Sequence, residues 1–275
     1  MTPQQVTEWA GFSLTRPLVM GILNITPDSF SDGGRHFDHD AAIMAGRRML
    51  DEGADILDIG GESTRPGARQ VDAETEIARI IPVVRALAAE GGVISLDTRN
   101  AATMEAGLDA GARIVNDITA LTHDPAALAL VAARDCSVIL MHMRGTPATM
   151  NELAAYHDVL KDVETELTVS CQAALAAGVR RQNICLDPGF GFAKRGEQNV
   201  ALLRGLAGLT RLGYPVLVAL SRKRFLGELS MESDAARRDP ESLAAGLYAI
   251  TQGAHILRVH DVAGTVRALR VWQQL

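Results

Sequence analysis

Ionisable and amide side chains stand at the ends of short apolar runs throughout this 275-residue chain. An apolar strand that is buried on both faces has no structural need to end in a charged residue. Parallel strands place their carboxyl ends on one side of a sheet or barrel, so such side chains would converge on one polar site. The residues at the run ends are Asn24, Asp58, Asp97, Asn116, His142, Asp187, Ser221 and Arg258.

Hydrogen-bond acceptors make up one part of this set. Asp97 and Asn116 end neighbouring runs, and Asp187 is followed by the rings of Phe190 and Phe192. A buried carboxylate must be paired or hydrogen-bonded, because leaving it bare costs several kcal/mol. A flat ligand rich in N–H donors would satisfy these acceptors, as would a neighbouring arginine in a purely structural role. The two rings could wall a flat pocket or plug the mouth of the site.

Cations make up the other part. Arg258, Val259 and His260 alternate as residues of a strand do, which points both basic side chains the same way. Lys223 lies in a basic run, 221–224, that directly follows an apolar strand, and it is the member of that run predicted to point inward. With Arg65 these cations form a local positive site in a chain of net charge −6, which suits a phosphate group.

Two loops after the first strands have compositions that suit ligand binding. The loop at 24–34 is long and rich in Gly, Ser and Asp, which is typical of a mobile lid, although a merely solvated loop has the same composition. In the loop at 60–67, paired glycines allow close backbone approach, and Thr64 and Arg65 could bind an oxyanion. His142 has no second histidine at metal-ligand spacing, so a structural role is predicted for it.

The elements that must position these residues alternate along the whole chain as apolar strand and amphipathic helix, with no linker between. The segments 53–58, 111–116 and 253–258 resemble one another: a glycine suited to a helix end is followed by an apolar strand and, at the same offset, a polar residue. Helical patterns cover 38–52, 72–90, 101–110, 125–133, 159–177, 198–212, 241–252 and 262–272.

Eight strand–helix pairs predict an α/β fold, a single (β/α)8 TIM barrel over 1–275, with 1–16 as an N-terminal lead-in. The active site is expected at the carboxyl-terminal ends of the strands. A doubly wound open sheet is the alternative, but the glycine fingerprint of dinucleotide sites and the Gly-Lys-Ser/Thr phosphate loop are both missing.

Composition limits the class of protein. Hydrophobic residues make up 47% of the chain, enough for a large core, and the acidic balance disfavours a nucleic-acid surface. Three scattered cysteines predict reduced, buried thiols rather than disulfides. Neither a secretory signal nor an apolar run of about 18 residues is found, so a cytoplasmic protein without a membrane partner is expected.

Taken together and in order, these motifs resemble the dihydropteroate synthases, pterin-binding enzymes of the folate pathway. The resemblance extends from Met20 to His260. It is carried by residues 21–33, 60–67, 95–98, 115–117, 141–143, 187–192, 221–223 and 258–260.

The resemblance implies a TIM barrel that joins p-aminobenzoate to 6-hydroxymethyl-7,8-dihydropterin diphosphate with Mg²⁺ and releases pyrophosphate. A homodimer formed through the late helices is also expected from it. The implied pterin ligands are Asp97, Asn116, Asp187 and Lys223. Asn24 is implied to bind Mg²⁺ and diphosphate, and the other implied diphosphate ligands are Thr64, Arg258 and His260. The aminobenzoate pocket is implied to include Phe30, Arg65 and Pro66. Phe190 and Val259 complete the predicted substrate-binding set, in which Asp97, Lys223, Arg258 and His260 are the predicted catalytic residues.

One position departs from some members of the family, which have serine where this chain has Arg224, beside the carboxylate of aminobenzoate. Two other functions share parts of the pattern. A methyltetrahydrofolate methyltransferase would use the pterin pocket but needs no diphosphate site, so Arg258 and His260 disfavour it. A non-catalytic pterin-binding paralogue would keep Asp187 and Lys223 and lose the diphosphate residues, which this chain retains.

Overall fold

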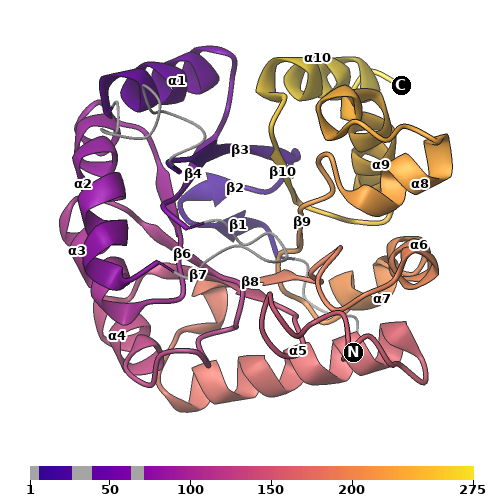
Figure 1. The fold of residues 1–275 in the computed structure, drawn as a ribbon, viewed down its shortest axis with the longest axis horizontal. Coiled ribbons are helices and arrows are strands. Elements are labelled where there is room, and N and C mark those ends of the chain that lie inside the picture. Colours follow the sequence, from indigo (N-terminus) through magenta and orange to yellow (C-terminus); the bar gives the residue numbers. More distant parts are fainter. Residues whose placement is uncertain (1–5, 27–38, 63–70) are drawn as a thin grey trace.

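The computed structural model describes residues 6–26, 39–62 and 71–275. Eight parallel strands curve into a barrel that is surrounded by helices (Figure 1). The sheet runs in the order β8-β7-β6-β5-β4-β3-β10-β9. Its two edges meet where Leu186 N donates to Pro215 O at 2.9 Å and Leu186 bridges to Val216, so the predicted barrel is confirmed. The strands are β3 Leu18–Asn24, β4 Ile56–Gly60, β5 Ile94–Asp97, β6 Ile114–Asp117, β7 Ser137–Met141, β8 Ile184–Asp187, β9 Leu217–Val218 and β10 Ile256–Val259.

Most helices lie where the sequence pattern predicts them. Three begin at aspartate caps: Asp72 accepts from Thr75 N, Asp158 accepts from Leu160 N and Asp261 accepts from Gly264 N. The predicted helix at 198–212 is divided at Gly205 into two helices, and a further short helix follows β9. The helices are α1 His39–Asp51, α2 Ala73–Ala89, α3 Ala101–Asp109, α4 Ala127–Arg134, α5 Val159–Ala176, α6 Gly196–Arg204, α7 Ala207–Thr210, α8 Arg224–Ser230, α9 Asp239–Thr251 and α10 Val262–Trp272.

Alternating strand residues supply the two layers of the core. On β10, Ile256 belongs to the cluster inside the barrel, whereas Leu257 packs in the outer cluster with the helices. Both layers consist mainly of aliphatic residues, as the low aromatic content predicts. Cys136, Cys171 and Cys185 are buried and free, which confirms their predicted state.

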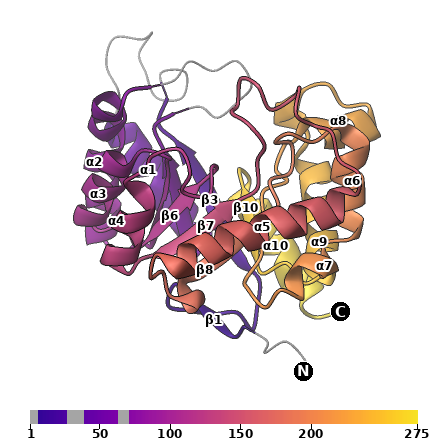
Figure 2. The same cartoon turned by 90° about the horizontal axis from the view of Figure 1, so that it is seen from below.

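A hairpin that the sequence pattern did not predict covers the amino-terminal end of the barrel. Strands β1 (Glu8–Trp9) and β2 (Phe12–Ser13) pair antiparallel within the N-terminal lead-in, and β1 lies below the barrel in Figure 2. Trp9 is 2% exposed and packs into the cluster inside the barrel. Its indole Nε1 donates to Asn183 O at 3.0 Å, so this end of the barrel is plugged.

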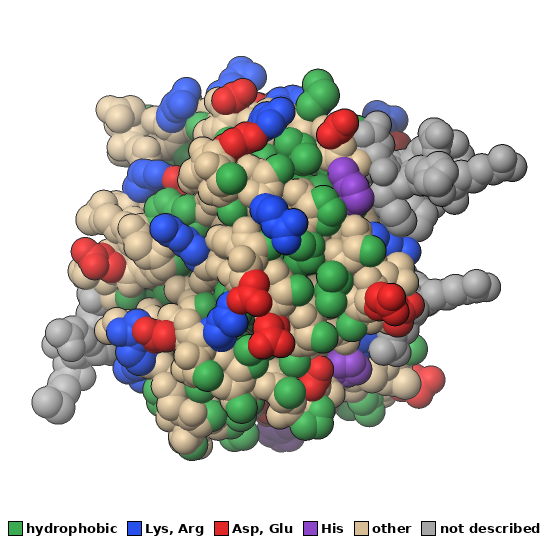
Figure 3. Space-filling model, turned by 90° about the vertical axis from the view of Figure 1, so that its left-hand side faces the viewer, with side chains coloured by type: hydrophobic (Ala, Val, Ile, Leu, Met, Phe, Trp, Pro, Cys, Tyr) green, Lys and Arg blue, Asp and Glu red, His purple; other side chains and the backbone are tan. Residues whose placement is uncertain are grey.

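The outer surface is mixed in charge. The face formed by α1 to α4 carries basic, acidic and apolar side chains interspersed with one another (Figure 3). Among the described residues, each helix is too short or too polar to cross a membrane.

Candidate active site

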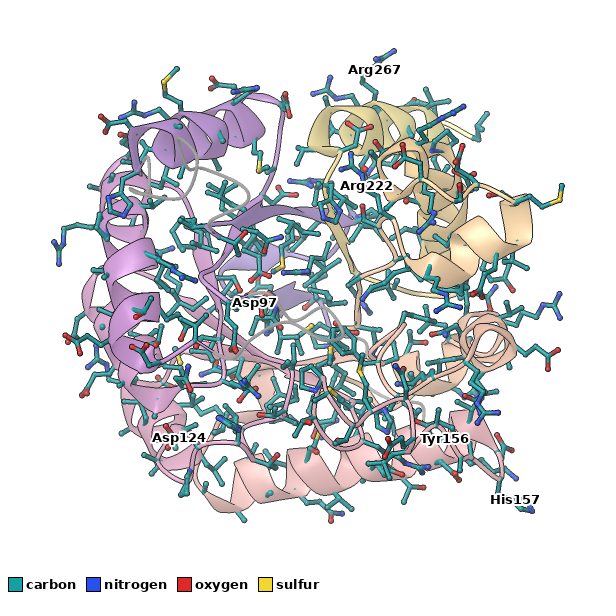
Figure 4. All side chains as sticks on the ribbon, viewed as in Figure 1. Asp97, Asp124, Tyr156, His157, Arg222 and Arg267 are labelled. Atoms are coloured by element: carbon teal, nitrogen blue, oxygen red, sulfur yellow. The ribbon has the colours of Figure 1, made fainter. Side chains whose placement is uncertain are left out.

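Four polar side chains from four strands meet at the carboxyl-terminal end of the barrel. Arg258 Nε donates to Asp58 Oδ2 at 2.5 Å, and Arg258 Nη2 donates to Asp97 Oδ2 at 2.6 Å. Asn116 Nδ2 donates to the same Asp58 oxygen at 3.0 Å. Asp97 lies near the centre of the barrel (Figure 4). The predicted convergence of Asp97, Asn116 and Arg258 is therefore confirmed.

The charges of this cluster do not balance, because two carboxylates share one guanidinium. Burial raises the pKa of Asp97 to about 7, although the charge of Arg258 opposes this and that of Asp58 adds to it. Burial disfavours the charged form of Arg258, yet Asp58 and Asp97 raise its pKa above the usual value. The cluster thus holds a permanent cation beside a carboxylate that can change its protonation near neutral pH.

Asp187 and Lys223 form the second part of the rim. Gly189 N donates to Asp187 Oδ1 at 2.7 Å, while burial raises the pKa of this carboxyl group. Lys223 Nζ lies 4.4 Å from the centre of the Phe192 ring. Burial lowers the pKa of Lys223 to about 8, against the opposing charge of Asp187. The charge of Arg258 also lowers the pKa of Lys223, and that of Asp97 raises it. The Asp187–Lys223 part of the rim therefore lies next to the Arg258 cluster.

The turn after β9 directs its basic side chains differently. Arg222, at a left-handed φ of 59°, points to Asp239, with Nε 2.7 Å from Oδ1. Arg224 pairs with Glu228 at 2.8 Å on the outside of α8 and is exposed. Lys223 is the member of the run that reaches the rim, as predicted. Ser221 Oγ lies 2.9 Å from Nδ1 of His260, which orients that ring.

Comparison with known proteins agrees with this geometry. Residues 20–260 match the model of the pterin binding enzyme family. The chain is 46% identical over 265 residues to the dihydropteroate synthase of Neisseria meningitidis serogroup C, covering 95% of this chain and 94% of that protein. The chain belongs to the dihydropteroate synthase family.

Solved structures of the family have the same fold. The enzyme of Xanthomonas albilineans with 4-aminobenzoic acid has a TM-score of 0.90 and 47% identity, covering 100% of this chain and 98% of that one. The same enzyme in complex with 7,8-dihydropteroate has a TM-score of 0.87 and 45% identity, covering 96% and 95%. The dihydropteroate synthase of Yersinia pestis with a sulfonamide drug has a TM-score of 0.90 and 43% identity, covering 96% and 95%.

Two predicted substrate-binding side chains lie away from the rim. Phe190 is 1% exposed and packs in the outer core, where its ring stacks with that of Phe225 at 6.3 Å. Phe192 instead takes the position beside Lys223. Val259 also packs against the outer core, because its neighbours Arg258 and His260 occupy the opposite side of the strand. The sequence pattern could not separate the two phenylalanines, since either could face the pocket.

Other predicted residues have a different status. Four of them belong to the two loops on the aminobenzoate and diphosphate side and lie outside the described residues. These are Phe30, Thr64, Arg65 and Pro66. Asn24 is half-buried at the end of β3.

Asp58 was predicted to stand at the rim but was given no role there; it joins Arg258 to Asn116. The repeated glycine-to-polar offset placed Asp58 at the depth of Asn116 and Arg258, and these contacts confirm that placement.

His142 has the structural surroundings that were predicted for it. The ring is buried, with Nε2 2.9 Å from Glu166 Oε2 and Nδ1 2.9 Å from Lys194 Nζ. Among the described residues, no group of three or more His, Cys, Asp or Glu side chains could hold a metal ion.

Proposed function

We infer that this chain joins p-aminobenzoate to 6-hydroxymethyl-7,8-dihydropterin diphosphate to give 7,8-dihydropteroate and pyrophosphate. The observation that carries the inference is the meeting of Asp97, Asn116 and Arg258 at one rim, within a family whose relatives have this activity in their names. The rim combines acceptors for a heterocycle rich in N–H groups with cations for its leaving group.

The pterin side consists of Asp97, Asn116, Asp187 and Lys223. Carboxylate and amide oxygens accept hydrogen bonds from ring N–H and amino groups, and the Lys223 ammonium donates to ring acceptors. Phe192 supplies an apolar surface beside that amine, suited to one face of a flat ring. These roles account for buried polar groups that would otherwise be costly to retain.

The diphosphate side consists of Arg258 and His260, together with Thr64 from a loop outside the described residues. Arg258 is held by Asp58 and remains a cation across the physiological pH range. Ser221 fixes the ring of His260. A planar guanidinium and a ring N–H are both suited to phosphate oxygens.

Mg²⁺ is the proposed cofactor, with Asn24 as its protein ligand. Mg²⁺ usually binds through one or two protein oxygens together with substrate phosphates and water, so it needs no cage of acidic side chains. Asn24 has a carboxamide oxygen at the end of a strand of the rim, which fits this mode of binding. When bound, the ion would neutralise charge on the leaving diphosphate.

The residues support a dissociative, cation-like displacement. The amine of p-aminobenzoate is neutral at pH 7, so a strong general base is not required. Loss of diphosphate leaves positive charge on the pterin methylene, and stabilisation of that charge is the role proposed for the Asp97 carboxylate. Arg258 and His260 stabilise the negative charge that develops on the leaving group. The two loops at 28–34 and 64–67, predicted to close over the site and exclude water, lie outside the described residues.

Pyrophosphate release tests the function directly. Purified protein is expected to release pyrophosphate only when pterin diphosphate, p-aminobenzoate and Mg²⁺ are all present, with dihydropteroate detected by mass spectrometry. An Arg258→Met variant is the inactive control. A well-folded wild-type protein that binds the pterin but releases nothing would be a non-catalytic paralogue.

A homodimer is the proposed oligomeric state. Large apolar side chains are exposed on the late helices, notably Leu229, Met231 and Tyr248 of the α8–α9 region. Exposed apolar groups of this kind commonly mark protein interfaces. Light scattering is expected to give twice the mass of the chain, and Met231→Asp is expected to lower it; a monomeric wild type would contradict the proposal.

The proposed location is the cytoplasm, which suits a chain with three free, buried cysteines. Cell fractionation tests this, and recovery from a secreted or envelope fraction would contradict it.

A further inference from the structure

Lysine is rare in this chain, and its distribution is uneven. Of the 27 basic residues other than histidine, only Lys161, Lys194 and Lys223 are lysines, and the rest are arginines. Lys161 is 81% exposed on α5. Lys223 belongs to the rim, whereas Lys194 is 7% exposed and has no role in the site described above. A chain that uses arginine almost everywhere has therefore buried a lysine close to its active site.

The ammonium of Lys194 has one acceptor for each of its three N–H groups. Nζ lies 2.9 Å from His142 Nδ1, 3.0 Å from Gly189 O and 3.0 Å from Phe192 O. The His142 carbonyl lies farther away, at 3.4 Å. We call Nζ and its three near acceptors the Lys194 anchor. A tetrahedral ammonium fits three converging acceptors, which a planar guanidinium would not.

The His142 ring is held as an acceptor by its other neighbours. Because Lys194 donates to Nδ1, the ring proton lies on Nε2 and is donated to Glu166, which Arg144 also binds at 3.0 Å. Burial lowers the pKa of His142 to about 4, so the ring is neutral at pH 7. This neutral tautomer is the form that the Lys194 anchor requires.

The anchor ties the loop after β8 to the end of β7. The carbonyls of Gly189 and Phe192 belong to the segment that follows Asp187, and His142 follows β7. At Gly189, φ is +68° and a Cβ atom would lie 2.0 Å from the His142 carbonyl oxygen, so the two segments are in close contact. The same loop supplies the amide that binds Asp187 and the ring beside Lys223.

We propose that Lys194 is a positioning residue for the pterin pocket: by holding the carbonyls of Gly189 and Phe192 against His142, it sets the positions of Asp187 and Phe192. The proposal rests on the proposed function, since it assigns this loop to the pterin side of the site. It also explains why lysine is retained here in a chain rich in arginine.

The surroundings of Lys194 make its charged form unfavourable, which is consistent with a functional role. Burial lowers the pKa of Lys194 to about 7; Asp187 and Glu166 oppose this, and Lys223 and Arg144 add to it. A buried amine with a lowered pKa is less stable as an ammonium than the same amine in water. An apolar residue would avoid this cost but would leave the three acceptors without donors.

The substitution Lys194→Met tests the proposal, with Lys161→Met as the matched control. Loss of the anchor is expected to raise KM for the pterin diphosphate about tenfold, which is the loss expected for charged hydrogen bonds. KM for p-aminobenzoate and kcat are expected to change by less than about threefold, because the anchor acts on the pterin side of the site and Lys223 itself is unchanged. Lys194→Arg is expected to resemble Lys194→Met, whereas Lys161→Arg is expected to be silent.

Chemical rescue distinguishes the anchor from simple packing. In Lys194→Ala, added n-propylammonium is expected to lower KM for the pterin, whereas propan-1-ol, which has similar bulk but no ammonium, is not. Equal rescue by both compounds, or an equal rise of both KM values in Lys194→Met, would overturn the proposal.

Wild-type protein with ¹⁵N-labelled lysine provides a test that needs no variant. Because the chain has three lysines, three side-chain signals are expected, and pterin diphosphate should shift those of Lys194 and Lys223 but not that of Lys161. A Lys194 signal that is unmoved while that of Lys223 shifts would refute the anchor. A wild type that binds pterin but releases no pyrophosphate would instead refute the proposed function and leave this test intact.

Discussion

The two ends of the barrel are closed by opposite kinds of chemistry. At the amino-terminal end, Trp9 from the β1–β2 hairpin fills the barrel among aliphatic side chains. At the carboxyl-terminal end, Arg258 forms ion pairs with Asp58 and Asp97 from two other strands. Apolar side chains could have closed this end of the barrel equally well. Burying charged groups often costs more stability than their attraction returns. One end of the barrel therefore stabilises the fold, whereas the other retains unfavourable groups for function.

Removing the plug should give the largest effect. Trp9→Ala is expected to lower the free energy of unfolding by about 3–5 kcal/mol, because it leaves a cavity in the packed end of the barrel. Urea denaturation measures this, and kcat/KM of the folded fraction should be unchanged. Trp272→Ala, at the partly buried end of α10, is the control and should cost less. Loss of activity without loss of stability would show that Trp9 acts on the active site and not on the fold.

At the opposite end, Asp97→Asn should lower kcat by about 10²- to 10³-fold, since it removes a charge that stabilises the transition state. KM for the pterin should change much less, and stability should be little affected. Steady-state kinetics tests this, with exposed Asp109→Asn on α3 as the control. An equal loss in kcat and in pterin affinity would point to simple binding.

The pH dependence of kcat/KM should report the two titrating groups at the carboxyl-terminal end. The Asp97 carboxylate is the active form and its pKa is raised to about 7, so activity should fall as the pH drops through that value. The Lys223 ammonium is the active form and its pKa is lowered to about 8, so activity should fall again above pH 8. Deprotonation of Lys194, whose pKa is lowered to about 7, should begin to lower kcat/KM by raising KM for the pterin already between pH 7 and 8.

Each limb should approach a tenfold change per pH unit beyond its pKa. Asp97→Asn is expected to remove the acidic limb and Asp109→Asn to keep it. An acidic limb that survives Asp97→Asn belongs to another group.

The smallest effects are expected for the two phenylalanines of the loop after β8, and they should differ between the two positions. Phe192→Leu should raise KM for the pterin about threefold, by removing the ring beside the Lys223 ammonium. Phe190→Leu should leave KM unchanged and cost less than about 1.5 kcal/mol of stability, because it replaces one apolar group by another in the core. The reverse result would show that Phe190, not Phe192, faces the pocket.

Much of the fold could be predicted from local patterns. The helix at Val262–Trp272 begins and ends where the sequence predicts, because apolar periodicity depends on neighbours in the chain. The β1–β2 hairpin was not predicted, because its strands are two residues long and carry no alternation. The predicted helix at 198–212 is divided, since its pattern continues through Gly205 where the helix ends.

The residues at the strand ends could be predicted from the order of apolar and polar residues, and thus also that Asp97, Asn116, Asp187 and Arg258 share one rim. Parallel strands in a barrel allow no other arrangement of their carboxyl ends. Tertiary structure alone decided the partners: Arg258 binds Asp58, 200 positions away, and Lys194 binds His142. Such contacts depend on barrel register and on how loops cross. No local pattern encodes them, because they join segments that meet only when the barrel closes.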